Sequence, residues 1–418
     1  MNPPPAVSAR PAVKGWCPGA LRPMPSGDGL VVRLRLTCNE APLALAGEIA
    51  DWAETLGNGQ IDLSARGNLQ LRGVTDATLP ALTRALAEAG LTDASPEAEA
   101  VRNVLVAPLA GYDPDAPFDV RPYAQALERE LAGNSKLWAL PGKFGFAFDA
   151  GAFPLGPAAA DVSFVATSAD GFVAVLGEAA LGPFPKADVV AIAGQLAEMF
   201  LALRRMPAPP RRMRDALAAF GLAPFTAATG YEAARFDPRP RRDALGVQPL
   251  GEGAFVGLAL PFGRIAAAEL RALAGLAAEA GATGLRLTPW RAILVPGLTP
   301  PAAQALAEAA SRLDLILDPA DPRLAVAACP GAPACSSGLG STRDVALRLA
   351  PLLAGAEGVV LHVSGCAKGC AHPAPARFAV VATAAGYDLI ANGRADEVPL
   401  ISGLALEALE TRFKERLA

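Results

Sequence analysis

The sequence predicts an internally duplicated α+β (α/β) fold, in which two small α+β units pair with each other and each is followed by a larger α/β segment. Three observations lead to this prediction. The chain matches itself at an offset of 224 residues, the matching segments share one order of strands and helix, and the segments that follow them share a similar order of elements.

The internal match runs without a gap between residues 27–73 and residues 251–297, and 11 of these 47 positions are identical. Four pairs of glycines coincide and mark turns. Both copies read as an alternating strand, an Ala/Leu-rich helix and a second strand. A unit of about 70 residues buries little core alone, so we expect the two copies to pack on each other around a pseudo-two-fold axis.

The predicted organisation has five parts. They are a small unit at 1–95, a larger α/β segment at 96–205, a linker at 206–249, a second small unit at 250–320 and a second α/β segment at 321–418. The linker is rich in proline and arginine. We interpret it as a solvated connection, and the alternative is that some of its arginines contact an anionic ligand.

The composition indicates a globular protein, and the N-terminal sequence favours one cellular compartment. With 52% hydrophobic and 19% charged residues the chain is typical of a globular protein, and its net charge of −4 argues against a general nucleic-acid binder. Charges interrupt the apolar stretches, so no membrane span is expected. Residues 1–20 are rich in proline and lack the apolar core of a secretory signal, which favours the cytoplasm, where clustered cysteines are more often metal ligands than disulfides.

Four of the six cysteines lie within 42 residues, as Cys329-Pro-Gly-Ala-Pro-Ala-Cys335 and Cys366-Ala-Lys-Gly-Cys370. Four thiolates suit a [4Fe–4S] cluster. Structural zinc is the alternative, but its cysteines usually lie two to four residues apart, and the first spacing is wider. Several glycines around the cysteines would let the backbone amides approach the sulfides.

The surrounding sequence indicates how the cysteines are held. Residues 341–344 (STRD) predict a capping box that opens a helix through residue 352, and residues 359–363 predict the strand that leads to Cys366. His362 is expected to be structural on that strand, whereas His372 lies two residues beyond Cys370. Cys17 and Cys38 are interpreted as small core or turn residues.

The two copies differ where chemistry is expected. Repeat one carries polar residues at positions where repeat two carries small or apolar ones: Arg33, Arg35, Arg66 and Gln70 against Gly257, Ala259, Trp290 and Leu294. The clustered cysteines lie only in the second half. One site shared between the halves would explain this division.

This cysteine signature, on the second half of a duplicated chain, resembles the sulfite/nitrite reductase family. The similarity extends over nearly the whole chain and is carried by residues 63–70 (LSARGNLQ), 101–104 (VRNV), 140–144 (LPGKF), the four clustered cysteines and residues 364–373 (SGCAKGCAHP). It implies a sulfite/nitrite-reductase-like architecture, with ferredoxin-like half-domains around a pseudo-two-fold axis and two larger α/β domains. Within the family the chain is most similar to a shorter member that oxygenates a tetrapyrrole.

The resemblance also implies a substrate pocket and further partners. The residues expected to line the tetrapyrrole pocket are Arg35, Arg66, Gln70, Arg102 and Lys143. Arginine suits the task, because its planar fork binds carboxylates bidentately. Dioxygen would supply a hydroxyl group at a bridge carbon, a ring acetate would close a lactone, and an external electron donor would reduce the cluster. A second, mononuclear non-heme iron is implied, but the sequence does not identify its ligands.

Two other functions remain open at this point. In a siroheme-dependent sulfite or nitrite reductase, Cys370 would bridge the cluster and the siroheme iron. Gly145 argues against this alternative. The reductases have a second lysine at this position, two residues after the lysine matched by Lys143, and without its charge a small oxyanion would be stabilised less. An electron carrier or sensor would use the cluster alone, but it would need no pocket for carboxylates.

Overall fold

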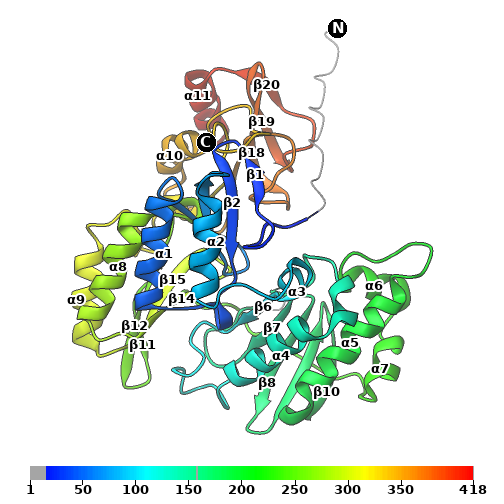
Figure 1. The fold of residues 1–418 in the computed structure, drawn as a ribbon. Helices are drawn as coiled ribbons and strands as arrows, with labels where there is room; N and C mark the ends of the chain where they lie inside the picture. Colours follow the sequence, from blue (N-terminus) through cyan, green and yellow to red (C-terminus); the bar gives the residue numbers. More distant parts are fainter. Residues whose placement is uncertain (1–15, 157–158, 418) are drawn as a thin grey trace.

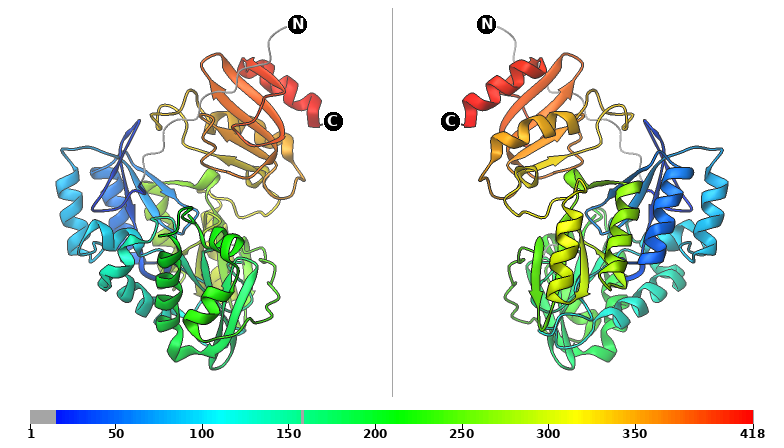
Figure 2. Two further views of the ribbon diagram at one scale, coloured as in Figure 1. Left: turned by 90° about the vertical axis from the view of Figure 1, so that its right-hand side faces the viewer. Right: turned by 90° about the vertical axis from the view of Figure 1, so that its left-hand side faces the viewer.

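The computed structural model describes residues 16–156 and 159–417, which form four five-stranded sheets covered by helices (Figure 1). Two sheets belong to the paired small units. The other two belong to the larger segments, which lie at different ends of the pair: that of repeat one is coloured cyan to green, and that of repeat two orange to red (Figure 2).

The two small units exchange a strand. The sheet of the first unit has the order β1 (Met24–Ser26), β2 (Gly29–Leu34), β5 (Leu69–Val74), β4 (Gln60–Leu63) and β13 (Arg264–Ala266). The sheet of the second unit has the order β11 (Gly246–Leu250), β12 (Gly253–Ala259), β15 (Ala292–Leu298), β14 (Gly284–Leu287) and β3 (Glu40–Pro42). The last strand of each sheet comes from the other repeat, which confirms the expected pairing of the copies.

Helices of both repeats close one shared core. They are α1 (Leu43–Thr55), α2 (Leu79–Glu88), α8 (Ala267–Glu279) and α9 (Pro300–Ala310). Helices α1 and α8 pack against each other, and Ile49 and Leu273 on them are fully buried in a cluster that includes residues of both sheets (Figure 1). Since burial of each such side chain contributes about 1.5–3 kcal/mol, neither unit would keep this core alone.

Two ion pairs of opposite polarity hold the exchanged strands. Arg264 of β13 lies opposite Asp62 of β4 and binds it at 2.7 Å, whereas Glu40 of β3 lies opposite Arg286 of β14 and also forms an ion pair. The internal repeat equates Glu40 with Arg264 and Asp62 with Arg286. Pairing two like repeats would therefore place acid opposite acid, or arginine opposite arginine, which is destabilising. The charge reversal favours pairing of unlike repeats.

The two larger sheets share one topology. Their strand orders are β10 (Ala179–Pro185), β9 (Gly171–Leu176), β8 (Val162–Ser168), β7 (Phe146–Asp149) and β6 (Val104–Val106), and β20 (Ile401–Leu404), β19 (Gly386–Gly393), β18 (Ala376–Thr383), β17 (Leu361–Ser364) and β16 (Val326–Ala328). In each sheet the first three strands in sequence run parallel and the last two pairings are antiparallel. The duplication therefore extends through the larger segments.

Further helices complete the larger segments and the stretch between the halves, and short 3-10 turns occur in all parts of the chain. The helices are α3 (Pro96–Val101), α4 (Arg121–Gly133), α5 (Val189–Leu203), α6 (Met213–Phe220), α7 (Ala223–Thr229), α10 (Arg343–Leu349) and α11 (Leu406–Leu417). The 3-10 turns are η1 (Thr37–Asn39), η2 (Ser135–Ala139), η3 (Lys186–Asp188), η4 (Pro261–Gly263), η5 (Pro322–Ala325) and η6 (Ala350–Leu353). Helices α6 and α7 lie within the segment that the sequence suggested as a linker, and they pack on α5 by burying Met213 and Phe225. None of the helices in the described ranges is long and apolar enough to cross a membrane.

Candidate functional site

The four clustered cysteines lie on two adjoining loops. Cys329 directly follows β16, and Cys366 lies two residues after β17. These strands are parallel neighbours, so their carboxyl ends meet at one edge of the sheet. The loops touch there: the Gly365 amide donates to Cys329 Sγ at 3.2 Å, and the Leu339 amide donates to the Gly365 carbonyl at 2.8 Å.

Glycines make this close approach possible. A Cβ atom at Gly365 would lie 3.1 Å from Gly331 Cα and 3.2 Å from Gly338 Cα, and one at Gly338 would lie 2.6 Å from the Ala332 nitrogen. Larger residues would push the loops apart. The cysteine sulfurs and the amides that face them therefore depend on these glycines, as the sequence suggested.

Four cysteines on two adjoining loops are the donor set that a [4Fe–4S] cluster takes. A tetrahedral zinc would need its four sulfurs about 2.3 Å from one centre, whereas an iron–sulfur cluster spreads its cysteines over several irons. Burial raises the pKa of the Cys366 thiol, and the nearby Cys329 and Cys335 raise it further, as expected for thiols gathered around one site.

The predicted capping box is wrong. Helix α10 begins at Arg343 with Thr342 as its N-cap, and the Ser341 hydroxyl donates to the Asp344 carboxylate instead of capping a backbone amide. The Thr342 hydroxyl donates to the Cys329 carbonyl at 2.5 Å, so it serves the cysteine loop. The helix ends at Leu349, before Pro351, and continues only as the short turn η6.

Repeat one clamps the first cysteine loop, which the sequence did not reveal. The Ala334 carbonyl accepts hydrogen bonds from Arg72 Nη2 at 2.6 Å, from Ser26 Oγ at 2.7 Å and from the Gly27 amide at 3.3 Å. Arg72 is buried and also pairs with the Asp28 carboxylate. The loop between Cys329 and Cys335 is thus held by a hairpin more than 300 residues away in the chain.

Asp62 ties the small units to the cysteine-bearing segment. Its buried carboxylate pairs with Arg72 of repeat one, with Arg264 of repeat two and with Arg343 at the start of α10, at 3.2, 2.7 and 3.1 Å. Although burial opposes ionisation, these arginines hold the pKa of Asp62 down at about 2. The carboxylate is therefore charged at neutral pH and joins three parts of the chain.

Two of the predicted substrate-binding arginines are already neutralised. Arg35 and Glu99 form a buried ion pair at 2.8 Å, with each side chain only 3% exposed. Arg102 binds the Asp93 carboxylate through Nε and Nη2 at 3.0–3.2 Å. Burial lowers the pKa of Arg102, but Asp93 outweighs that effect and raises it. The positive charge of each guanidinium is therefore already balanced by a carboxylate, although Arg35 Nε has no hydrogen-bond partner among the described residues.

Gln70, Arg33 and Cys17 form a further group of polar side chains. The Gln70 side-chain oxygen accepts from Arg33 Nη2 at 3.0 Å, and Arg33 Nε has no hydrogen-bond partner. Burial and the neighbouring Arg35 lower the pKa of Arg33 to about 10. The Cys17 thiol lies close to the Arg33 guanidinium and acts against this lowering of its pKa. Cys38 is buried and lies elsewhere, on turn η1.

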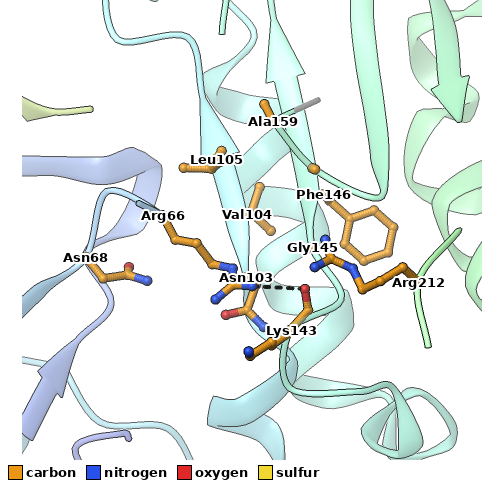
Figure 3. Close-up of a pocket in the computed structure, with 11 residues that line it drawn as sticks. Arg66, Asn68, Asn103, Val104, Leu105, Lys143, Gly145, Phe146, Ala159 and Arg212 are labelled. Atoms are coloured by element: carbon orange, nitrogen blue, oxygen red, sulfur yellow. Dashed lines mark hydrogen bonds between the residues drawn. The ribbon is translucent and has the colours of Figure 1, made fainter. Parts of the chain in front are cut away.

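Arg66 and Lys143 meet in a small pocket (Figure 3). Arg66 Nη2 donates to the Lys143 backbone carbonyl at 3.2 Å, and Arg212 reaches the pocket from its other side. Arg212 is paired with Asp161, whereas Arg66 has no carboxylate partner among the described residues. Gly145 also lines the pocket. The structure thus brings together Arg66 and Lys143 but places Arg35, Gln70 and Arg102 outside this pocket.

A larger hollow, open to solvent, lies beside the second cysteine pair. Its walls come from the second small unit, from the end of the segment predicted as a linker and from the cysteine-bearing segment, including Ala371 and His372 directly after Cys370. Ala65 lines this hollow, while the next residue, Arg66, lines the small pocket. One loop of repeat one therefore separates the two cavities.

The two histidines lie near each other. Their ring centroids are 5.9 Å apart, and His362 is fully buried with no hydrogen-bond partner on either ring nitrogen. Burial and the neighbouring His372 lower the pKa of His362 to about 4. The described residues offer no third side-chain ligand here, so this pair by itself does not fit a mononuclear iron site.

Comparisons with known proteins agree with this architecture. A family model described as the nitrite/sulfite reductase ferredoxin-like half domain matches residues 22–89 and 247–313. The chain is 34% identical over 404 residues to a precorrin-3B synthase of Sinorhizobium sp., covering 92% of this chain and 84% of that protein. It is 27% identical over 390 residues to a ferredoxin–nitrite reductase of Synechococcus elongatus, covering 84% and 76%. The NirA protein of Mycobacterium tuberculosis has the same fold, with a TM-score of 0.74, 20% identity and coverage of 93% and 80%.

Proposed function

This chain belongs to the sulfite/nitrite reductase family, and we propose that within it the chain acts as a precorrin-3B synthase. In the proposed reaction an iron–sulfur monooxygenase uses dioxygen to hydroxylate precorrin-3A at C20, while the ring A acetate closes a lactone, in aerobic cobalamin biosynthesis. The similarity to a precorrin-3B synthase along most of both chains supports this choice. The reaction adds one oxygen atom to the substrate and reduces the other to water, with two electrons from an external donor and two protons.

One observation favours this function over sulfite or nitrite reduction. The positions matched to the anion-binding cations of the reductases carry arginines that are already paired, Arg35 with Glu99 and Arg102 with Asp93. Gly145 stands in the place of a further lysine, so the site has one cation fewer. A small oxyanion would therefore meet a site of reduced positive charge.

Different residues of this chain would hold the cluster and bind the substrate. Cys329, Cys335, Cys366 and Cys370 would hold a [4Fe–4S] cluster, which when bound supplies electrons received from the donor. Arg66, Lys143 and Arg212 line a small pocket, and Asp161 neutralises Arg212. The remaining positive charge can bind a carboxylate side chain of the substrate. Fixing that side chain would hold the bridge carbon in place for oxygenation.

The proposal includes no role for a mononuclear iron held by the chain alone. His362 and His372 are the only histidines in the sequence, and no third donor accompanies them among the described residues. A cytoplasmic location and an external electron donor belong to the proposal as well, the donor because ferredoxin is named as the partner of related reductases.

The test is the visible spectrum of protein purified without oxygen, together with its iron and sulfide content. We expect a broad brown absorption from the cluster, no macrocycle bands, and consumption of dioxygen when precorrin-3A and a reductant are added. Intense siroheme bands with turnover of sulfite or nitrite would instead support the reductase, the alternative function. A cluster with no effect on any of these substrates would support an electron carrier or sensor.

A further inference from the structure

Cys17 lies among positively charged side chains, a setting that the sequence did not reveal. Burial lowers the pKa of Arg33, Arg35 and Arg66, and the Cys17 thiol opposes that lowering in all three, so its sulfur is near each guanidinium. The Cys17 side chain is only partly buried. Cysteines in such surroundings are reactive, because the thiolate is the nucleophilic form and neighbouring cations stabilise it.

The buried Glu99 carboxylate fixes the segment that carries Cys17. Its Oε1 accepts from the Ala20 amide at 2.6 Å, and its Oε2 accepts from the Leu21 amide at 3.0 Å. Glycine is required at position 19 for this approach, because a Cβ atom on Gly19 would lie 2.4 Å from the Glu99 carboxylate. The thiol is therefore held close to the arginines by a buried contact.

The side chains beside Cys17 have hydrogen-bond donors left over. Arg33 and Arg35 are 9% and 4% exposed, and the Nε atom of each is buried without a partner in the described part of the chain. The Arg33 side chain lies within hydrogen-bonding reach of the Cys17 sulfur. The indole N–H of Trp16, next to Cys17, is likewise buried and unpartnered among the described residues. Buried donors are costly without an acceptor, so this group indicates that an anionic oxygen can be held here.

Cys38 provides the opposite case in the same small unit. Its side chain is buried, and burial raises the pKa of its thiol to about 12, with Glu128 and Glu40 adding to the effect. At pH 7 roughly one Cys38 side chain in 100,000 is therefore a thiolate. The other four cysteines are those assigned to the cluster. Cys17 is thus the reactive thiol that we expect outside the cluster.

We propose that Cys17 is an oxidation site, at which hydrogen peroxide converts the thiolate to a sulfenate that Arg33 and Arg35 hold. The sulfur attacks one peroxide oxygen, so that an S–O bond forms and the O–O bond breaks. The sulfur loses two electrons and the peroxide gains them, and the departing hydroxide takes the proton of the sulfenic acid to form water. The new oxygen accepts hydrogen bonds from the unpartnered Nε–H groups of the two arginines. The step needs neither a tetrapyrrole nor the cluster, so it is independent of the proposed function.

Oxidation would also place a negative charge beside Arg66. Under the proposed function, Arg66 binds a carboxylate of the substrate, and a sulfenate nearby would compete for the same guanidinium. Peroxide would then weaken substrate binding. This consequence rests on the proposed function, whereas the oxidation itself does not.

The experiment treats the anaerobically purified full chain, with its cluster, with hydrogen peroxide in the presence of dimedone, which traps sulfenic acids. Mass spectrometry of the digested protein gives the rate of labelling at each cysteine. The variant is Arg33→Met, and the control is Arg84→Met, an exposed arginine on helix α2 of the same small unit. Melting temperature and iron content identify any variant that fails to fold. Comparison of Cys17 with Cys38 within the unmodified chain needs no variant at all.

We expect Cys17 to be labelled at least about 100-fold faster than Cys38. Labelling of Cys17 should be about ten-fold slower in Arg33→Met and unchanged in Arg84→Met, because one hydrogen bond from a charged donor is worth at least that factor. Dithiothreitol added after the peroxide and before dimedone should prevent labelling, since a sulfenic acid is reduced by thiols. Equal labelling of Cys17 and Cys38, or an unchanged rate in a folded Arg33→Met variant, would overturn the inference.

Discussion

Replacing Asp62 with asparagine should weaken the contacts between three parts of this molecule. Asp62 is buried, and its carboxylate is the shared partner of Arg72, Arg264 and Arg343. Asparagine keeps the shape of the side chain but removes its charge. The guanidinium groups of Arg72, Arg264 and Arg343 would then lose their common anion. That of Arg72 is buried and would keep only Asp28 as a carboxylate partner among the described residues, while the side chains of Arg264 and Arg343 are 19% and 16% exposed.

The magnitude can be worked out in two ways. Removing one partner from a buried ion pair costs about 3–5 kcal/mol, because the remaining charges stay buried and unpaired. Linkage gives a smaller figure: a shift of the Asp62 pKa from 3.8 to about 2 corresponds to roughly 2 kcal/mol. We expect about 3 kcal/mol, since linkage counts only the interaction of the charge and truncation also leaves the arginines unpaired.

The pH dependence of this contribution has a definite sign. The folded-state pKa of Asp62 lies below its ordinary value of 3.8, so protonation favours the unfolded chain. The contribution is complete above about pH 4 and is lost as the pH falls toward about 2, through the folded-state pKa. Asp62→Asn should remove this part of the acid sensitivity while lowering stability at neutral pH.

The assay is urea unfolding of the anaerobically purified protein at pH 7, followed by tryptophan fluorescence. Glu40→Gln is the matched control, because Glu40 occupies the equivalent ion pair in the other exchanged sheet but its side chain is 28% exposed. We expect that control to lose less than Asp62→Asn, because Glu40 is partly exposed and pairs with two arginines, Arg286 and Arg121, of which only Arg286 is buried. A loss below 1 kcal/mol in Asp62→Asn, or equal losses in both variants, would refute the role assigned to Asp62.

Three further outcomes are expected. Cys366→Ala should lose the cluster and destabilise the C-terminal segment, and full iron and sulfide content in that variant would show that the ligand assignment is wrong. Arg72→Met should release the Ala334 carbonyl and shift the reduction potential of the cluster, measured by a spectroscopic redox titration, and an unchanged potential would argue against the clamp. Glu99→Gln should free Arg35 and tighten binding of sulfite, measured by calorimetry, and unchanged sulfite binding would mean that the ion pair does not control anion affinity.

The duplication and the cysteine pattern were readable from the sequence because both depend on local signals. Glycines at fixed spacing mark equivalent turns, and the cysteines that share a site lie within 42 residues. The order of strands in both repeats followed from alternating apolar residues in segments such as β2 and β12. These features therefore predicted the fold class, and the structure confirmed it.

Features that depend on partners far apart in the chain could not be read in this way. The exchanged strands β3 and β13 have only three residues each, too few to show alternation. Arg35 could be placed on a strand, but its partner Glu99 is 64 residues away, so its neutralisation was hidden. Arg72 looked like an ordinary strand residue until the structure placed it on the Ala334 carbonyl.

Local rules also failed where tertiary contacts compete for the same atoms. The residues at 341–344 have the composition of a capping box, but the Thr342 hydroxyl is taken by the Cys329 carbonyl. The segment at 206–249 has the proline content of a linker, yet two short helices form there because Met213 and Phe225 find apolar surface to cover. A tertiary hydrogen bond in the first place, and burial of apolar side chains in the second, outweighed the local pattern.

The most direct test of the proposed function is incubation of the anaerobically purified protein with precorrin-3A, a reduced electron donor and ¹⁸O₂, followed by mass spectrometry of the product. We predict a product that carries one ¹⁸O atom, with none incorporated from H₂¹⁸O into the new hydroxyl group. Recovery of unchanged precorrin-3A from protein with a full cluster, or reduction of sulfite or nitrite in its place, would contradict the proposal.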